Sequence, residues 1–383
     1  MDFKIYSLDE LVKIRYGKNQ KQVQDDSNGI YPILGTGGLM GYATKFIYDK
    51  PSVLIGRKGN IDKVKYIEEP FWTVDTLFYT EVNENIVIPK YLYYLMSLID
   101  FGQYNEGTSI PSLRTETLNK LEFPIPSLIN QSRILEKISA FDYLIKTNEK
   151  INKNLENILN SIFKEKFINK FSDILHSWRI VKIKELPLII TDYVANGSFA
   201  SLKENVSILN NEDYAYFIRN TDLKSKTFEK FVSKSSYDFL KKSSLSGNEL
   251  IISNVGDVGS VFLCPFLNKP MTLGNNMILI KSKENAITLN FYLFLLFKSE
   301  FGQYLINTIT SGSVQLKFNK TDFKSLELVM PTDKEIINFN ELVSPIFDYK
   351  VEISNEIVKL TNLRNILLPK LMSGDLNVLD SEV

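Results

Sequence analysis

The feature that most constrains this chain is a repeat of its own sequence at a distance of about 200 residues. The motif Phe-Gly-Gln-Tyr at residues 101–104 recurs at 301–304, and Asn-Ile-Leu at 157–159 recurs at 365–367. Six such matches keep the same order, while their offset grows slowly from 200 to 208 residues. Solenoid repeats are only about 20–50 residues long. The pattern therefore indicates two copies of one domain in a chain of 383 residues.

Composition excludes several classes of protein. The 45 basic and 45 acidic residues cancel, so any nucleic-acid surface must come from local segregation of charge. One cysteine, Cys264, excludes an internal disulfide and favours a cytoplasmic protein. One histidine, His176, leaves no usual zinc site and lies in no nucleophile motif, so we interpret it as structural or capping. The aromatic-aliphatic run at 291–297 is too short to cross a membrane.

Each half ends in a segment with the heptad spacing of a coiled coil. Apolar residues alternate at intervals of four and three between 134 and 162, and again between 336 and 367. Proline and glycine are absent from 127–170, and about 40 helical residues make a rod of roughly 60 Å. The seam is predicted to contain Ile134, Ile138, Phe141, Ile145, Leu155, Ile346, Ile353, Ile357 and Leu360.

Two arrangements of these rods are open. Both can pack inside one helical core, or they can pack on each other, antiparallel, as a spacer; the equal lengths favour the spacer. Polar residues interrupt both seams and are expected to fix register, namely Asn148, Asn152, Lys350 and Arg364. Pro345 predicts a kink or a restart of the second rod, with Ser344 as the cap.

The segment before each rod mixes strands and loops. In the first half, 51–56 and 72–79 are strand-like, and 34–42 is a glycine-rich loop. The loop lacks the Walker and Gly-x-Gly-x-x-Gly patterns, so nucleotide binding is disfavoured. It is interpreted as tight turns, or as a close approach to a nucleic-acid strand. In the second half, 250–259 and 273–279 are the matching pieces.

The most specific candidate for DNA contact is a segment rich in basic residues. Residues 50–65 hold five basic residues and one acid, which fits either a solvated hairpin or a phosphate-binding loop. Arg57 or Lys58 can reach guanine edges, whereas Asn254 in the second half suits adenine and Asp257 suits cytosine. The candidate DNA-binding residues are Thr36, Gly37, Gly38, Tyr42, Arg57, Lys58, Gly59, Asn60, Ser109 and Arg114 in the first half, and Arg219, Asn220, Ser253, Asn254, Asp257, Asn275, Asn276, Ser313, Gln315 and Lys317 in the second.

Taken together, these motifs resemble one family. The chain is similar to the specificity (S) subunit of type I restriction–modification systems in its repeat, in Gly-Thr-Ser-Ile-Pro-Ser-Leu at 107–113 and in Phe-Pro-Ile-Pro at 123–126. It also matches in the rod that begins near Gln131 and in the tail at 367–376. The resemblance implies an α+β fold: two mixed target-recognition domains in a pseudo-twofold arrangement, each followed by a long helix, with the helices forming an antiparallel coiled coil.

The resemblance also implies domain boundaries within the chain and a separation of DNA recognition from catalysis. The expected domains are 1–126 and 173–331 for recognition, with helical regions at 127–172 and 332–383. Each recognition domain is expected to read one part of a split, asymmetric site in double-stranded DNA. The chain itself is expected to be non-catalytic and to hold no cofactor or metal. S-adenosylmethionine, ATP and Mg²⁺ belong to its partners, two methylation subunits and the restriction subunits.

The residues themselves leave other functions open. No Asn-Pro-Pro-Tyr/Phe string for adenine methylation and no Walker loop occurs, which disfavours a self-sufficient methyltransferase or nuclease. A two-module scaffold that binds sugars or proteins remains the main alternative. The second half also holds about 20 extra residues, somewhere between 187 and 245, that the sequence does not place.

Overall fold

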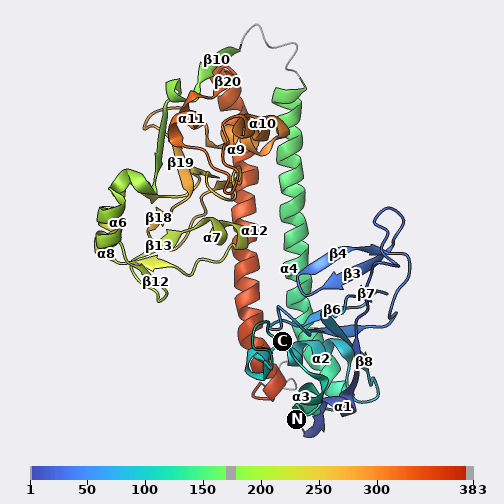
Figure 1. The fold of residues 1–383 in the computed structure, drawn as a ribbon. Helices are drawn as coiled ribbons and strands as arrows, with labels where there is room; N and C mark the ends of the chain where they lie inside the picture. Colours follow the sequence, from blue (N-terminus) through green and yellow to red (C-terminus); the bar gives the residue numbers. More distant parts are fainter. Residues whose placement is uncertain (1, 170–177, 377–383) are drawn as a thin grey trace. The chain divides into compact units, whose positions relative to one another are not determined.

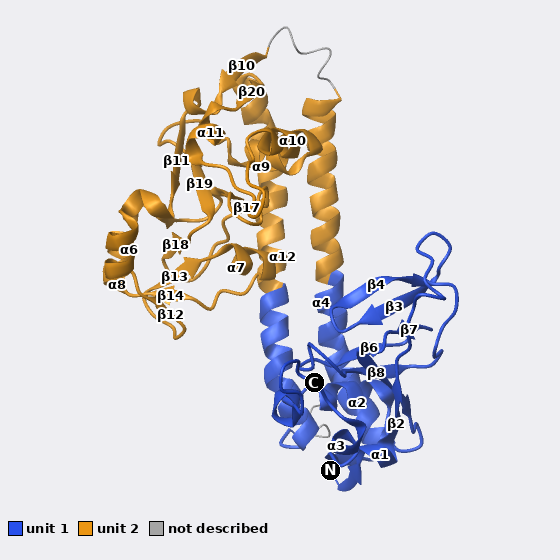
Figure 2. Cartoon of the chain, in the orientation of Figure 1, with its two compact units in different colours: residues 1–147, 357–383 blue, residues 148–356 orange. Residues whose placement is uncertain are grey.

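The computed structural model describes residues 2–169 and 178–376 (Figure 1). The chain divides into two compact units: unit 1 is Met1–Thr147 with Ile357–Val383, and unit 2 is Asn148–Glu356 (Figure 2). Each unit contains its own sheets and part of both long helices. His176 and the expected boundary at 172/173 lie outside the described residues.

Unit 1 is built on three small sheets. The antiparallel pair is β1 (Phe3–Ser7) with β9 (Glu122–Pro126), the four-stranded sheet is β2 (Val12–Tyr16), β8 (Leu77–Val82), β5 (Ser52–Gly56) and β6 (Lys65–Ile67), and the three-stranded sheet is β4 (Gly38–Ala43), β3 (Tyr31–Gly35) and β7 (Trp72–Thr73). The short helices are α1 (Leu8–Leu11), α2 (Pro89–Met96), η1 (Phe101–Tyr104) and α3 (Thr115–Leu118).

Unit 2 repeats this order with additions. Its pair is β10 (Arg179–Lys182) with β20 (Glu327–Met330), its four-stranded sheet is β11 (Leu188–Asp192), β19 (Met277–Ser282), β16 (Leu250–Ser253) and β17 (Val261–Leu263), and its five-stranded sheet is β12 (Ile208–Leu209), β14 (Phe231–Val232), β13 (Ala215–Ile218), β18 (Met271–Leu273) and β15 (Ser244–Leu245). The helical segments are η3 (Ile183–Glu185), η4 (Tyr193–Asn196), α6 (Phe199–Asn205), α7 (Asn220–Ser225), α8 (Lys234–Phe239), η5 (Lys241–Ser243), α9 (Asn290–Lys298), α10 (Glu300–Thr308) and α11 (Lys320–Ser325).

Strand register confirms the duplication and places the extra residues. Both units contain one parallel pair, β3 with β7 and β13 with β18, in a sheet that is otherwise antiparallel. The offset between equivalent residues is 176 at β2 and β11, 184 at β3 and β13, and 197 at β5 and β16. The insertion is therefore split into two parts. A smaller part precedes β13 and includes α6, and a larger part between β13 and β16 includes α7, α8 and β15.

The stretch 72–79 is two strands and not the single strand expected. β7 pairs with β3, whereas β8 pairs with β2 and β5. Between them Val74 donates to Leu34 O (3.0 Å), and Thr76 O accepts from the backbone N–H of Arg57 (2.8 Å). The chain changes sheets here, so the break brings a turn beside the loop that follows β5.

The two rods are long helices. α4 (Leu128–Phe163) continues into a π-helical turn, η2 (Lys164–Ile168), and α12 (Asp333–Ser373) is a single helix. The restart expected at Pro345 is therefore wrong. Pro345 and Glu341, whose carbonyl loses its helical partner, are both exposed, so water can satisfy that carbonyl. The helix ends at Gly374, which has φ of +82°.

The rods run antiparallel, the arrangement that their equal lengths favoured. In unit 1 the Arg364 guanidinium lies 2.8 Å from Asp142 Oδ1. In unit 2 Asn148 donates to Glu356 (3.0 Å) and Asn152 donates to Ser354 Oγ (3.1 Å), so residue numbers fall on α12 as they rise on α4.

All four polar residues of the seams bond across to the opposite helix, because Lys350 also lies 3.6 Å from Glu156. Ile134, Ile138 and Ile353 are buried. The remaining seam residues are partly buried: Phe141, Ile145, Leu155, Ile346, Ile357 and Leu360.

Each rod is also part of a globular core. In unit 1, Ile134 and Ile138 of α4 and Leu371 of α12 join Phe78 and Tyr91 in one buried cluster. In unit 2 an aromatic cluster forms around α9, and Phe167 lies 4.9 Å from Phe339 and 5.0 Å from Tyr292 between ring centroids. The rods are therefore fixed to the sheets by apolar burial, which is the dominant stabilising term in folding.

Candidate nucleic-acid interface

In unit 1 two loops that are far apart in the sequence are bonded together. Residues 57–60 follow β5, and residues 107–112 follow η1. Gly59 donates its N–H to Pro111 O (2.9 Å), Leu113 donates to Arg57 O (3.0 Å), and Lys58 forms a bridge with Ser112. Arg57 and Lys58 both donate to Thr76 O. These hydrogen bonds bring the predicted residues 57–60 and Ser109 close together and hold the backbone of both loops in place.

Unit 2 repeats these bonds with different residues. Gly256 donates to Leu316 O (2.9 Å), Phe318 donates to Asn254 O (3.0 Å), and Val255 forms a bridge with Lys317. Asn254 donates to Asn276 O (3.1 Å), as Arg57 does to Thr76 O. Residues 57–60 therefore correspond to 254–257, and 107–113 correspond to 312–318. We call each such pair of loops a loop pair.

A glycine closes the second loop of each pair. A Cβ atom on Gly107 would lie 1.9 Å from Ile110 O, and one on Gly312 would lie 2.3 Å from Gln315 O. Real Cβ contacts are never this short, and Gly312 also has φ of +113°. Both loops therefore have a tight fold that admits no side chain at this position.

The cations of the first loop pair are not equally available. Arg57 donates through Nη1 to Asp75 O (2.7 Å), and its guanidinium lies 5.2 Å from the centre of the Tyr16 ring. Lys58 is exposed, as are Gly59 and Asn60. Arg114 pairs with Glu106 at 3.1 Å and lies just before α3. Lys58 is thus the cation best placed for a phosphate, while Arg57 must break an internal bond to reach a base.

The β3–β4 hairpin reaches the same place only at its tip. Lys65 Nζ donates to Gly35 O (3.0 Å) and Thr36 O (3.1 Å), and Thr36 Oγ1 lies 3.9 Å from the Cβ position of Gly59. The tight turn at Thr36, Gly37 and Gly38 is confirmed. Tyr42 pairs with Pro32, about 10 Å further along the strands.

In unit 2 the polar side chains at and around the loop pair bond to one another. Asn220 donates to Asp257 (2.9 Å), and Lys224 Nζ lies 2.6 Å from the same carboxylate oxygen. Burial alone would raise the pKa of Asp257, but hydrogen bonds from Lys224, Asn220 and Ser260 outweigh it and lower the pKa to about 2. Arg219, just before α7, pairs with the buried carboxylate of Asp222 in the first turn of that helix.

One candidate is removed by burial. Ser253 is fully buried in β16, and its Oγ donates to Asn276 O (3.4 Å), so it cannot contact a base. The amide of Asn254 donates to Phe318 O (3.0 Å) and braces the loop instead of projecting freely. Asn275 and Asn276 lie in the exposed turn between β18 and β19, where Asn276 has φ of +64°.

The loop tips also carry exposed apolar residues that the sequence reasoning missed. Val314 is 100% exposed, Ile110 is 61% exposed and Leu316 is 52% exposed. The signal was available, since aligning Gly107 with Gly312 places all three in one loop. Ser313, Gln315 and Lys317 are exposed beside them.

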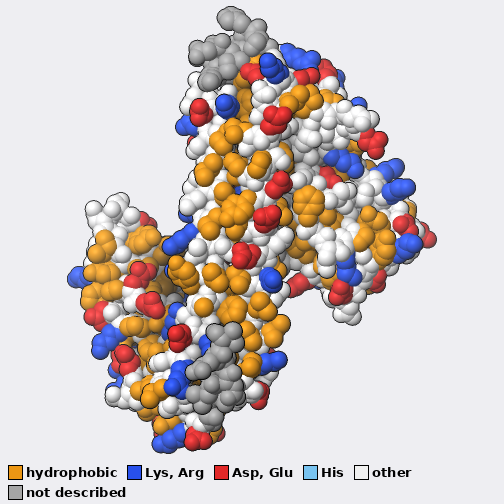
Figure 3. All heavy atoms as spheres, turned by 180° about the vertical axis from the view of Figure 1, so that it is seen from behind, with side chains coloured by type: hydrophobic (Ala, Val, Ile, Leu, Met, Phe, Trp, Pro, Cys, Tyr) orange, Lys and Arg blue, Asp and Glu red, His pale blue; other side chains and the backbone are white. Residues whose placement is uncertain are grey.

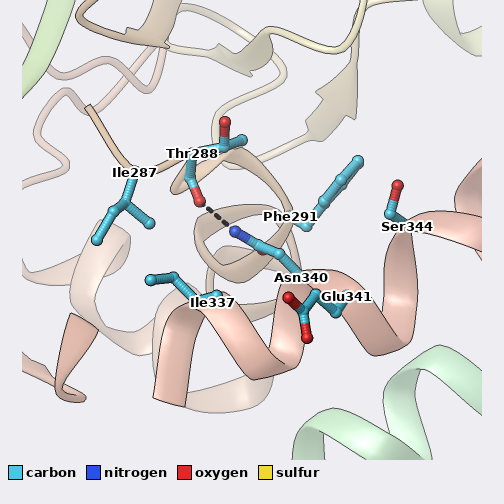
Figure 4. A pocket seen from close by; sticks show the side chains of 7 residues that line it. All are labelled: Ile287, Thr288, Phe291, Ile337, Asn340, Glu341 and Ser344. Atoms are coloured by element: carbon cyan, nitrogen blue, oxygen red, sulfur yellow. Dashed lines mark hydrogen bonds between the residues drawn. The ribbon is translucent and has the colours of Figure 1, made fainter. Parts of the chain in front are cut away.

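Other surfaces offer weaker candidates. On the face shown in Figure 3, lysine and arginine side chains alternate with acidic ones and do not gather into one basic surface. A shallow pocket of about 350 Å³ lies between α9 and α12. There Asn340 donates to Thr288 O (2.7 Å), and its Oδ1 is buried without a partner (Figure 4). Within 2–169 and 178–376, no helix is long and apolar enough to cross a membrane, and no cluster of His, Cys, Asp and Glu could hold a metal ion.

Comparison with known proteins decides the family. Residues 1–157 and 176–359 match the model of the type I restriction modification DNA specificity domain. The chain belongs to this family. DNA sequence recognition in a type I restriction–modification system is therefore its function, and catalysis lies in other subunits.

Relatives of the specificity family match most of the chain. The MjaIX specificity subunit of Methanocaldococcus jannaschii is 25% identical over 87% of this chain and 79% of that protein. The HindI specificity subunit of Haemophilus influenzae is 20% identical over 80% and 81%. The crystal structure of a type I S subunit from M. genitalium has a TM-score of 0.59, with 16% identity over 97% and 96%, and so shares the fold. The α+β architecture with two long antiparallel helices is confirmed.

Proposed function

We propose that each unit of this specificity subunit reads one part of a split DNA site through its loop pair. The proposal rests on one observation. The two loop pairs form corresponding backbone hydrogen bonds, but they present different side chains. Lys58 and Asn60 in unit 1 correspond to Val255 and Asp257 in unit 2. A conserved backbone with changed side chains is what two readers of unrelated half-sites require.

The proposed contacts fall into two kinds. Lys58, Lys317 and the N–H-rich glycine turns suit phosphates, which position a protein without reading sequence. Asn60, Ser109, Gln315, Asn275 and Asn276 are exposed groups that can bond to base edges. Asp257 and Asn220 would act as a pair, since they are already bonded to each other. The recognition domains are proposed to extend over 1–126 and 173–331.

We propose that α4 and α12 set the gap between the half-sites and bind the partner subunits. Exposed apolar residues recur on both helices at repeat positions: Tyr143 (71% exposed) with Tyr349 (46%), and Ile158 (47%) with Ile366 (57%). Single exposed apolar residues are common on protein surfaces, so the support for this proposal is their recurrence at repeat positions of both helices. Two equivalent sets fit two methylation subunits.

In the proposed complex the partners supply the chemistry. The methylation subunits would hold S-adenosylmethionine, and the restriction subunits would hold ATP and Mg²⁺. The complex would act on DNA in the cytoplasm.

The test uses the chain assembled with its methylation subunits. Methylated adenines are mapped in host DNA, and binding to a duplex that carries the mapped site is measured from 50 to 200 mM salt. The proposal expects a split, asymmetric site and an affinity that falls steeply with salt. Binding without sequence preference or salt dependence would favour a protein scaffold and overturn it.

A further inference from the structure

The tips of the second loops, 107–111 and 312–316, are rigid platforms. Ser311 and Lys317 exchange two backbone hydrogen bonds (2.9 and 2.8 Å) that close the loop in unit 2. Glu106 donates to Ser112 O (2.9 Å) at the same place in unit 1. Gly256 and Gly59 bond the far side of each tip. A side chain on such a tip is presented in a fixed position, so little ordering entropy opposes binding.

Each tip carries an exposed β-branched aliphatic residue next to at least one polar residue. In unit 2 this is Val314, between Ser313 and Gln315, and in unit 1 it is Ile110, after Ser109. The equivalence of the loops pairs Val314 with Ser109, and Gln315 with Ile110. At these two positions the apolar residue of one tip corresponds to a polar residue of the other. Two domains that contact a methyl group at different positions in their half-sites would show this difference.

The chemistry of the tips fits a thymine methyl group better than a protein partner. Protein interfaces are anchored by large aromatic or arginine side chains, whereas the exposed apolar residues here, Val314, Leu316 and Ile110, are aliphatic and stand beside hydrogen-bonding side chains. The major-groove edge of an A·T pair has the same composition, with the C5-methyl of thymine beside hydrogen-bond acceptors and a donor. Gln315 also suits adenine, and Lys317 supplies a cation for the neighbouring phosphate.

From this match we infer that Val314 reads a thymine methyl group in the half-site of unit 2, and that Ile110 does so in the half-site of unit 1. The inference rests on the proposed function, because it needs the loop pairs to face DNA. It goes beyond that function by naming the atom that each tip recognises. A methyl group buried on binding contributes about fourfold in affinity.

The test removes methyl groups from the DNA one at a time. In the complex with methylation subunits, each thymine of the mapped site is replaced by uracil, and competition binding is measured for the wild type, Val314→Ala and Ile110→Ala. We expect one uracil position in one half-site to weaken wild-type binding about fourfold and to have no further effect on Val314→Ala. A position in the other half-site should behave in the same way with Ile110→Ala.

The controls separate this inference from the proposed function. Phe199→Ala removes another exposed apolar side chain, on α6 of unit 2, and should leave every uracil response unchanged. Thermal unfolding of Val314→Ala should match the wild type, since a fully exposed side chain contributes no core packing. If the wild type binds its site specifically but no uracil position is coupled to Val314 or Ile110, the inference is wrong while the proposed function stands. If the wild type shows no specific binding, the proposed function itself fails.

Discussion

The two loop pairs share their backbone and differ in their side chains. In unit 1 Arg57, after β5, bonds to the turn before β8, and in unit 2 Asn254, after β16, bonds to the turn before β19. In both units a glycine then bonds to the tip of the second loop. Yet unit 1 presents Lys58 and Asn60 where unit 2 presents Val255 and Asp257. The comparison teaches that the fold preserves where side chains are placed and leaves their identity free to vary.

The rods show a second contrast, in charge. The repeat maps Glu156 onto Arg364 with an offset of 208, and Asp142 onto Asp348 with an offset of 206. In unit 1 Asp142 pairs with Arg364, and in unit 2 Glu156 pairs with Lys350. Both acids lie on α4 and both bases lie on α12. This asymmetry favours pairing of α4 with α12 and disfavours pairing of either helix with a copy of itself.

The largest effect should come from the glycines that close the loops. Gly312→Ala forces a Cβ atom against Gln315 O at a positive φ, which costs about 1–3 kcal/mol and displaces the tip. We expect loss of specificity at the half-site of unit 2 alone, measured by mapping of methylated adenines. Gly107→Ala is the matched variant and should affect only the other half-site. Loss of both half-sites from either change would contradict independent readers.

A smaller effect is expected from Lys58, an exposed cation that unit 2 lacks at the corresponding position. Lys58→Val gives unit 1 the residue that unit 2 has at the corresponding position. Binding should weaken about three- to tenfold for all DNA sequences, and the slope of log affinity against log salt should fall by about one. Lys63→Val, outside the loop pair, is the control. A loss confined to one base position would instead assign Lys58 to base reading.

The ion pair of unit 1 should contribute less. Arg364→Asp places two acids together between helices and should lower the free energy of unfolding by about 1 kcal/mol. The double variant Asp142→Arg with Arg364→Asp should recover much of this loss in chemical denaturation. Failure to recover would show that the orientation of the pair, including the bond from Tyr94 to Asp142, matters more than its charge.

The smallest effect is a response to acid at the loop pair of unit 2. The pKa of Asp257 is lowered to about 2, below its ordinary 3.8, so its contribution to stability is present above about pH 4. That contribution is lost as the pH falls toward 2. The stability difference between the wild type and Asp257→Asn should therefore disappear over this range. The equivalent Asn60 does not titrate, so Asn60→Ala should show no such change; a difference that stayed constant with pH would contradict the assigned bonds.

The sequence predicted the parts of the molecule that periodicity determines. The heptad spacing placed Ile134, Ile138 and Ile353 in the seam, and the repeat identified equivalent loops. It failed where tertiary partners decide. The break at 74–76 depends on a change of sheet, and the burial of Ser253 depends on strand register. From the sequence alone the charge of Arg57 is predicted to be available to DNA. In the structure its guanidinium already donates to Asp75 O and lies over the Tyr16 ring.

The most direct measurement of the central claim is an exchange of one loop pair. Residues 57–60 and 107–112 are replaced by the corresponding residues of a related specificity subunit, and methylated adenines are mapped for the assembled complex. Two separate readers predict that one half-site changes while the other half-site and the gap stay the same. A simultaneous change in both half-sites, or an unchanged site, would contradict the account.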